Sequence, residues 1–236
     1  MQLWIYGVLI RLVTPAVFVW LWLRGGKDSR YRQNWSERLA LGSVDKKQHG
    51  CLVIHSVSVG ETLAAKRLIE QLLRQEPGQK ILITCMTPTA RELIQQHFGD
   101  TVSCRYWPID TPGAAKRFVR KFKPKAVWVM ETELCPQMLN QFSKANIPVA
   151  LLNARLSARS AAGYRRFHWL MKKVWKQLTL VSVQNKETAR RMKVLGVPDS
   201  VLFVDGNLKY DIELSVTDIE KALLWRQSCA SRHVWL

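Results

Sequence analysis

Short apolar runs alternate with longer amphipathic segments along most of this chain. Each run has the length and composition of a buried strand, and a segment with helical spacing follows it after Gly, Pro or small polar residues. The pattern predicts strands over residues 51–54, 80–84, 103–107, 126–130, 149–153, 178–183 and 201–204. It predicts helices over residues 61–75, 90–98, 111–122, 161–176 and 186–195, with another behind residues 131–133. Strands and helices in strict turn indicate a parallel sheet covered on both faces, so we expect a Rossmann-like α/β fold.

The amino-terminal end has a different pattern. Residues 3–23 are almost wholly apolar, and their length is about that of one membrane span. Because no small-residue cleavage site follows, we expect residues 1–24 to be a membrane anchor that is retained in the mature protein. Arg11 and Pro15 leave a second interpretation open, a helix that lies in the interface or turns back within one leaflet. Aromatic residues near both ends are typical of rings at the bilayer interfaces: Trp4, Tyr6, Trp20 and Trp22.

Charge gives a second indication of a membrane. The 236 residues include 36 Lys and Arg against 18 Asp and Glu, and the net charge of +18 attracts nucleic acid, an anionic membrane or a phosphorylated substrate. By the positive-inside rule, basic residues after the anchor place the following domain in the cytoplasm, and they can hold anionic head groups. A merely solvated basic linker is the alternative for residues 25–50. The residues concerned are Arg24, Lys27, Arg30, Arg32 and Arg38.

Other function classes have less support. Nucleic-acid binding rests on net charge alone, and since no recognised nucleic-acid module is present we expect no such partner. The five cysteines show no C-x-x-C pair and no His at ligand spacing, which argues against a zinc site and favours a reducing compartment. The dinucleotide signature G-x-G-x-x-G is absent, so NAD has no support. A Ser-His hydrolase built on His55 and Ser58 is disfavoured, because G-x-S-x-G is absent too.

Candidate chemistry gathers where the predicted strands end. In an open α/β sheet the substrate site forms at the carboxyl ends of the strands, next to the free N–H groups of the following helices. Glu61 stands in the first helical turn after the first strand. A carboxylate there can simply complement the helix dipole, or it can serve as a general base at the lip of a cleft. Polar residues at the other strand ends favour the second interpretation: Thr87, Thr89, Asp110, Glu131, Glu133, Asn153, Arg155, Asn207 and Lys209.

Five motifs carry a resemblance to one enzyme family: HSVSVGETLAA at 55–65, METELCPQ at 130–137, NARLSARSAAGY at 153–164, QN at 184–185 and GNLKYD at 206–211. In these motifs the sequence resembles the Kdo transferases. They are membrane-associated bacterial enzymes that move 3-deoxy-D-manno-octulosonic acid (Kdo) from CMP-Kdo to a lipid A precursor, lipid IVA. The family has two Rossmann-like domains in the GT-B arrangement. The similarity runs from the anchor to about residue 235, and the part matched is the amino-terminal, acceptor-binding domain.

The resemblance implies roles for individual residues. Glu61 matches the family's general base, and Glu131 and Lys209 match groups that support the transition state. The implied reaction is inverting, on the cytoplasmic side of the bacterial inner membrane, with CMP-Kdo as donor and no metal or other cofactor. For substrate binding we expect Ser56, Ser58, Gly60, Thr87, Asn153, Arg155 and Arg159. Arg155 and Arg159, with Arg165 and Arg166, are candidates for the acceptor's phosphates, and an ordinary charged helix surface is the alternative.

Some positions depart from the family pattern. Cys135-Pro136-Gln137 stands where the family has Trp-Pro-Asn, and Ala90 stands where it has Gly; both changes leave the assigned catalytic groups in place. We expect residues 51–212 to form the acceptor-binding domain. Residues 213–236 are expected to be a linker followed, at Val234–Leu236, by the first strand of a second, nucleotide-binding domain that is missing. A truncated product that binds membrane and acceptor without sugar transfer is therefore the strongest rival.

Overall fold

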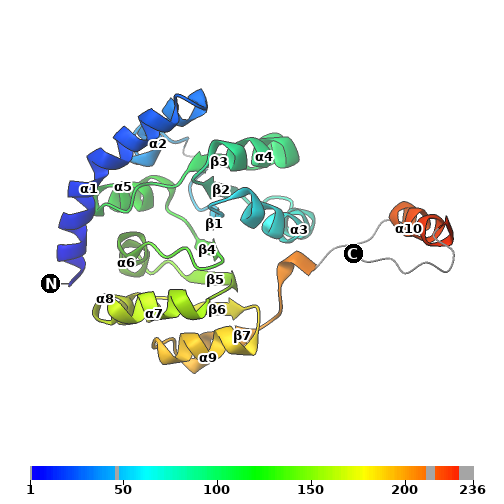
Figure 1. Cartoon of the computed structure of the whole chain (residues 1–236). Helices are drawn as coiled ribbons and strands as arrows, with labels where there is room; N and C mark the ends of the chain where they lie inside the picture. Colours follow the sequence, from blue (N-terminus) through cyan, green and yellow to red (C-terminus); the bar gives the residue numbers. More distant parts are fainter. Residues whose placement is uncertain (1, 46–47, 211–215, 229–236) are drawn as a thin grey trace.

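The fold is built on one parallel sheet, as the alternating pattern predicts. The computed structural model describes residues 2–45, 48–210 and 216–228. Its seven strands lie in the order β3-β2-β1-β4-β5-β6-β7, and every neighbouring pair is parallel (Figure 1). The switch point of this order lies between β1 and β4, where open α/β sheets bind their ligands. The strands are β1 (Leu52–His55), β2 (Ile81–Cys85), β3 (Ser103–Tyr106), β4 (Ala126–Met130), β5 (Val149–Ala154), β6 (Leu180–Val183) and β7 (Leu202–Val204).

Helices cover both faces of the sheet. Alternate strand residues enter two separate cores, with Val53 and Val127 in one and Ile54 and Ile83 in the other. This period of two explains why the strand sequences are apolar throughout. The first core includes side chains of α5 (Pro112–Phe122), α6 (Pro136–Lys144), α8 (His168–Trp175) and α9 (Lys186–Val194), and the second those of α3 (Val59–Gln75) and α4 (Pro88–Phe98).

Polar caps fix where the helices begin, next to the carboxyl ends of the strands. Ser58 caps α3, Thr87 caps α4 and Asn185 caps α9, each by accepting a hydrogen bond from a backbone N–H in the first turn. Proline occupies the start of α4, α5 and α6, where its missing N–H costs nothing. As a result α3 and α4 begin two residues earlier than the apolar spacing predicts.

The prediction of one helix over residues 161–176 is wrong. The chain forms α7 (Ala158–Arg166) and α8, and between them Phe167 has non-helical backbone angles. Helix α7 is polar and has no buried residue, whereas α8 buries an apolar face that includes Val174 and Trp175. A break at Phe167 lets α8 turn its face to the core while α7 stays at the surface.

The carboxyl-terminal region contains a helix that the hydrophobic pattern does not predict. Helix α10 (Val216–Ser228) lies within residues 213–236, which were expected to hold a linker. The predicted strand at Val234–Leu236 lies outside the described residues. The division into a linker and a second domain therefore stays a prediction.

The basic segment after residue 24 is largely folded, through η1 (Ser29–Arg32) and α2 (Trp35–Arg38). Arg38 is buried, its guanidinium lies 4.0 Å from the Tyr106 ring centroid, and it donates a hydrogen bond to the Met86 carbonyl. Glu37 forms ion pairs with Arg91 and Arg105 on α4 and β3. The expectation that Arg38 holds lipid head groups, or lies in a solvated linker, is therefore wrong, because the residue is part of the core.

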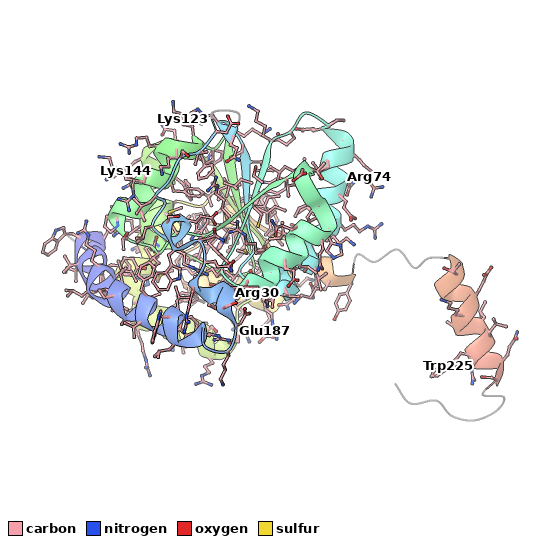
Figure 2. All side chains as sticks on the ribbon, turned by 90° about the horizontal axis from the view of Figure 1, so that it is seen from above. Arg30, Arg74, Lys123, Lys144, Glu187 and Trp225 are labelled. Atoms are coloured by element: carbon pink, nitrogen blue, oxygen red, sulfur yellow. The ribbon has the colours of Figure 1, made fainter. Side chains whose placement is uncertain are left out.

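Helix α1 (Gln2–Arg24) contains the predicted apolar stretch. Within the described ranges it is the one helix long and apolar enough to cross a membrane by length and composition. It continues through Pro15 without a break, and Thr14 donates its hydroxyl to the carbonyl of Ile10 one turn back. Figure 2 shows α1 along the lower left of the domain, below the labelled Lys123 and Lys144, which stand at the ends of α5 and α6 near the amino ends of β4 and β5. Helix α1 thus runs along the side where the strands have their carboxyl ends.

Candidate active site

Carboxylates that follow two neighbouring strands lie at the switch point of the sheet. Glu61 follows β1, and Glu131 and Glu133 follow β4, which pairs with β1. All three carboxylates are close enough for the charges of Glu131 and Glu133 to affect the ionisation of Glu61. The prediction that residues from different strand ends gather at one edge is correct for this group.

The side chain of Glu61 is buried, with 6% of its surface exposed, and folds back onto the loop before it. One carboxylate oxygen accepts a hydrogen bond from Val57 N at 2.7 Å, and the other accepts one from Ser58 Oγ at 3.0 Å. Ser58 in turn accepts from Glu61 N at 3.5 Å, so the two residues cap α3 reciprocally. Glu61 therefore caps the start of α3 and also lies at the end of β1. Its structural role at the helix start is compatible with the predicted role as a general base.

Burial raises the pKa of Glu61 from 4.5 to about 7, because the charged form loses water. Hydrogen bonds from Val57 N and Ser58 Oγ oppose this rise, and the neighbouring carboxylates of Glu133 and Glu131 add to it. Burial and Glu131 also raise the pKa of Glu133. A carboxyl group with a pKa near 7 exchanges its proton readily at neutral pH, which is the property that a general base needs.

Glu131 and Lys209 form an ion pair across the edge of the sheet. The Nζ atom of Lys209 lies 3.2 Å from a carboxylate oxygen of Glu131, and the two side chains are 45% and 25% exposed. Glu131 has a left-handed backbone, with φ of 55°, while its N–H donates to the carbonyl of Leu152 on β5. Such a conformation is uncommon outside glycine and asparagine, and it turns the chain sharply at the point where the strand ends.

Asn153 positions the segment that carries Lys209. Its side-chain oxygen accepts a hydrogen bond from the N–H of Leu208 at 3.1 Å, in η5 (Leu208–Tyr210), and its carbonyl accepts one from Gln184. The side chain is 1% exposed, its φ is 54°, and its amide nitrogen has no hydrogen-bond partner within the part of the chain that the structure describes. Beside it is a hollow of about 320 Å³, bounded by Leu68, Leu152, Asn153, Ser182 and residues 205–208. The predicted substrate-binding role of Asn153 stays a prediction.

The other predicted binding residues divide into two groups. Ser58 and Gly60 lie beside Glu61, and Thr87 caps the helix after the adjacent strand β2, where its hydroxyl accepts from Ala90 N. Ser56 is fully buried and shares a hydrogen bond with Thr62, so the structure does not bring its hydroxyl to the surface of the site.

The two predicted arginines lie at the rim. Arg155 follows β5 and is exposed, and its carbonyl accepts the hydroxyl proton of Thr132 from the loop after β4. Arg159 is exposed in the first turn of α7, with no contact to the carboxylate group. Their predicted role toward phosphate remains untested.

Glu133 is the residue that the assignment of site residues missed. Its carboxylate belongs to the electrostatic group around Glu61, and the available signal was the pair of carboxylates two residues apart at the end of β4.

The hydrolase alternative finds no support, because His55 is buried, stacks on Trp107 at 4.1 Å and bonds to Thr84 instead of Ser58. Among the described residues, no group of three or more His, Cys, Asp or Glu side chains is placed to hold a metal ion.

Comparison with known proteins connects this geometry to a family. A family model described as 3-deoxy-D-manno-octulosonic-acid transferase (kdotransferase) matches residues 33–212. The 3-deoxy-D-manno-octulosonic acid transferase of Haemophilus influenzae is 35% identical over 98% of this chain and 55% of its own length. The transferase of Bordetella pertussis is 28% identical over 94% of this chain and 53% of its own length. The chain spans about half the length of these curated relatives.

A solved structure shows the same fold. The UDP-GlcNAc 2-epimerase of Neisseria meningitidis aligns with a TM-score of 0.50 and 15% identity, over 74% of this chain and 53% of the epimerase. With the parallel sheet described above, this likeness agrees with the amino-terminal Rossmann-like domain of the GT-B arrangement. The chain belongs to the 3-deoxy-D-manno-octulosonic acid transferase family, and matches its amino-terminal half.

Proposed function

We propose that this chain is the acceptor-binding domain of a Kdo glycosyltransferase of lipopolysaccharide biosynthesis, which transfers Kdo from CMP-Kdo to the lipid A precursor lipid IVA. The observation that carries the proposal is the buried carboxyl group of Glu61, with a pKa of about 7, beside the Glu131–Lys209 ion pair. These are the three residues that the motifs assign to catalysis. Family membership supports the reaction class.

Glu61 is the general base of the proposed reaction. A sugar hydroxyl is a weak nucleophile at neutral pH, and a carboxylate within hydrogen-bond reach accepts its proton as the new bond forms. The hydroxyl of lipid IVA attacks the anomeric carbon of Kdo, the bond from that carbon to the phosphate oxygen of CMP breaks, and the configuration inverts. The proton passes to the carboxylate of Glu61, and CMP leaves with the bonding electron pair.

Lys209 and Glu131 act on the charge that builds up in this step. The donor sugar carries a carboxylate and the leaving group is a phosphate, so the transition state needs a nearby cation. Lys209 supplies it, and Glu131 holds its ammonium group in place at 3.2 Å. Arg155 and Arg159, exposed at the rim, are proposed to bind the phosphates of the acceptor, because guanidinium groups grip phosphate bidentately. The proposal needs no metal or other cofactor.

The proposed site of action is the cytoplasmic side of the bacterial inner membrane, where α1 attaches the domain. The exposed apolar residues of α1 and the net charge of +18 support attachment to an anionic leaflet. A glycolipid acceptor lies in the same leaflet, so an attached domain meets it by diffusion in two dimensions.

The test uses a two-domain protein in which residues 1–212 are joined to the carboxyl-terminal part of the Haemophilus influenzae relative. With CMP-Kdo and lipid IVA in vesicles, we expect Glu61→Gln to lower kcat by about 100-fold or more, since general base catalysis contributes that much. Glu70→Gln, which removes a carboxylate from the partly exposed Lys66–Glu70 pair on the same helix, is the matched control and should leave kcat unchanged. Undiminished transfer by the Glu61 variant would contradict the proposal.

The same proteins and substrates also test a second candidate function, which is acceptor binding without sugar transfer. The candidate site residues from Ser58 to Lys209 all lie within the described residues of this chain, which supports acceptor binding by this part alone. If the 236-residue chain binds lipid IVA vesicles and transfers no sugar while the two-domain protein does, the chain functions alone only as a binding domain. Transfer by the 236-residue chain would exclude this second function.

A further inference from the structure

The first half of α1 is attached to the core of the domain. Tyr6 Oη donates a hydrogen bond to Asp110 Oδ2 at 2.9 Å, and Gln137 Nε2 donates one to the carbonyl of Leu3 at 2.6 Å. Gly7 packs so closely that a Cβ there would lie 2.8 Å from Cγ of Pro112. These contacts join the start of α1 to the starts of α5 and α6, at the carboxyl edge of the sheet.

Asp110 makes this attachment part of the fold. Its carboxylate is 7% exposed and accepts hydrogen bonds from Gln137 N at 3.0 Å and Met138 N at 2.9 Å, in addition to that from Tyr6. It thereby satisfies the free N–H groups of the first turn of α6. Helix α6 follows directly on the loop of Glu131 and Glu133. One buried side chain thus connects α1 with the helix next to the candidate site.

The second half of α1 contacts η1 and α2, which are themselves joined to the domain by the ion pairs of Glu37 with Arg91 and Arg105. Leu21 is 2% exposed, and the ring of Phe18 lies 5.1 Å from that of Trp35 in α2. The guanidinium of Arg24 lies 5.0 Å from the ring centroid of Trp20 and 5.1 Å from that of Tyr31. Both ends of a helix about 34 Å long, at roughly 1.5 Å per residue, therefore contact one folded domain. A helix that crosses the hydrocarbon core needs about that whole length free of the domain.

The side of α1 that turns away from the domain is apolar along its full length. Trp4, Leu9, Leu12, Val19, Trp20 and Leu23 are each between 50% and 72% exposed. Such a continuous apolar face on a helix is unfavourable in water, and contact with lipid acyl chains would remove it from water. Basic residues lie beside this apolar face. Arg11 is exposed near the middle of the helix, and Arg24 and Arg32 stack on tryptophan rings at its carboxyl end. This charge complements the phosphates of anionic phospholipids.

We propose that α1 lies in the plane of an anionic leaflet without crossing it, so that both of its ends stay on the side of the domain. The inference rests on the membrane attachment in the proposed function and specifies its geometry. It decides between the two interpretations that the sequence leaves open. It also removes the difficulty of Arg11, whose guanidinium reaches head-group phosphates when the helix lies flat.

The same geometry places the candidate site. Helix α1 contacts Asp110, which follows β3, and the start of α6, which follows β4, so it runs along the carboxyl edge where Glu61 and Glu131 lie. Figure 2 shows α1 below Lys123 and Lys144 in that view. A leaflet in contact with the outer face of α1 is therefore on the same side of the domain as the site, within reach of a lipid-borne acceptor.

The first measurement is attachment itself. The chain is mixed with vesicles of phosphatidylglycerol and phosphatidylcholine, or of phosphatidylcholine alone, and sedimented. We expect sedimentation with the anionic vesicles, and a loss of about 10-fold or more in binding for Leu12→Glu, which places a charge in the exposed face of α1. Val194→Glu, at a similarly exposed apolar position on α9, is the matched control and should bind as the wild type does. Absence of attachment would overturn both this inference and the membrane part of the proposed function.

The second measurement is topology. An epitope tag is placed before Met1, and a second tag after Leu236 reports the side of the domain. Protease is then added outside spheroplasts or outside inverted inner-membrane vesicles. If α1 lies in the plane, both tags are removed only in the inverted vesicles. Removal of the amino-terminal tag in spheroplasts, with the second tag protected there, would show a crossing helix and overturn this inference while leaving membrane attachment intact.

Discussion

The ammonium group of Lys209 lies 3.2 Å from the carboxylate of Glu131, a residue that precedes it by 78 positions in the chain. The pair connects the end of a central strand, β4, to the segment that follows the edge strand β7. Because Asn153 binds the backbone of the same segment from β5, three strand ends hold the lysine in place.

Breaking this pair should affect catalysis far more than stability. Both side chains are partly exposed, and an exposed ion pair contributes below about 1 kcal/mol to the free energy of unfolding. In the two-domain protein we expect Glu131→Gln to lower kcat by about 10- to 100-fold, because Lys209 loses the partner that orients it. Kinetics and urea unfolding measure the two effects.

A matched control for Glu131 is Glu187→Gln. This variant removes one carboxylate from the Arg191–Glu187 ion pair at the surface of α9, on the same domain. It should leave both kcat and the urea midpoint close to those of the wild type. Equal losses of kcat in the two variants would show that Glu131 has no particular role in transfer.

The pH dependence of transfer should follow the ionisation of Glu61. With a pKa of about 7, the general base is mostly protonated in mildly acidic solution, so kcat/KM should rise about tenfold per pH unit below 7 and level off above it. Ser58→Ala removes a hydrogen bond that holds the pKa of Glu61 down, so the midpoint of the profile should move to higher pH. A midpoint that does not move would show that another group governs the profile.

The same carboxyl group should make the folded chain less stable as the pH rises. The folded pKa of about 7 lies above the ordinary value of 4.5, so the folded chain keeps a proton that the unfolded chain has already lost. The contribution of this group to the free energy of unfolding is fully present below pH 4.5 and is lost progressively as the pH rises to about 7. The full loss is roughly 3 kcal/mol, from 1.36 kcal/mol per pKa unit.

Urea unfolding of the wild type and of Glu61→Gln checks this loss. The variant lacks the ionisation, so its stability relative to that of the wild type should increase between pH 5 and pH 8. Comparing the same two proteins at both pH values cancels the contribution of every other titrating group. An identical difference at the two pH values would contradict a raised pKa.

Substitutions at Asn153 should separate backbone strain from the hydrogen bond to Leu208. Asn153→Ala loses the bond and places an alanine at φ of 54°, so we expect a destabilisation of about 2 to 4 kcal/mol. Asn153→Gly loses the same bond but adopts this backbone without strain, and it should be about 1 kcal/mol more stable than the alanine variant. Urea unfolding measures the difference. In the two-domain protein both variants should lose transfer activity, because the Lys209 segment is released.

The sheet and its helices were predictable because their signals are local. Apolar runs such as Leu52–Ile54, and cap residues such as Ser58, determine strands and helix starts within a few positions of sequence. Motif resemblance singled out Glu61, Glu131 and Lys209 as catalytic candidates, a role that stays a prediction; the structure pairs Glu131 with Lys209 and places Glu61 within the electrostatic influence of Glu131. Parallel strands align their carboxyl ends, so order along the chain was enough to predict that edge.

What the sequence did not reveal depends on contacts between distant residues. The buried position of Arg38, the attachment of Tyr6 to Asp110 across 104 positions, and the hold of Asn153 on Leu208 leave no periodic trace. The break at Phe167 was missed for a related reason, since helical spacing continues through it while the core requires the chain to turn. A charged residue after an apolar helix looks the same in sequence whether it faces lipid or an aromatic ring.

The bond between Tyr6 and Asp110 has a consequence for engineering this protein. A helix that served only as an anchor could be exchanged for another hydrophobic segment. Helix α1 cannot be exchanged in this way, because its Tyr6 donates a hydrogen bond to the buried Asp110. Replacing α1 with an unrelated hydrophobic segment would leave Asp110 without the hydrogen bond that Tyr6 donates. Solubilised versions should therefore retain α1 and change only its outer face.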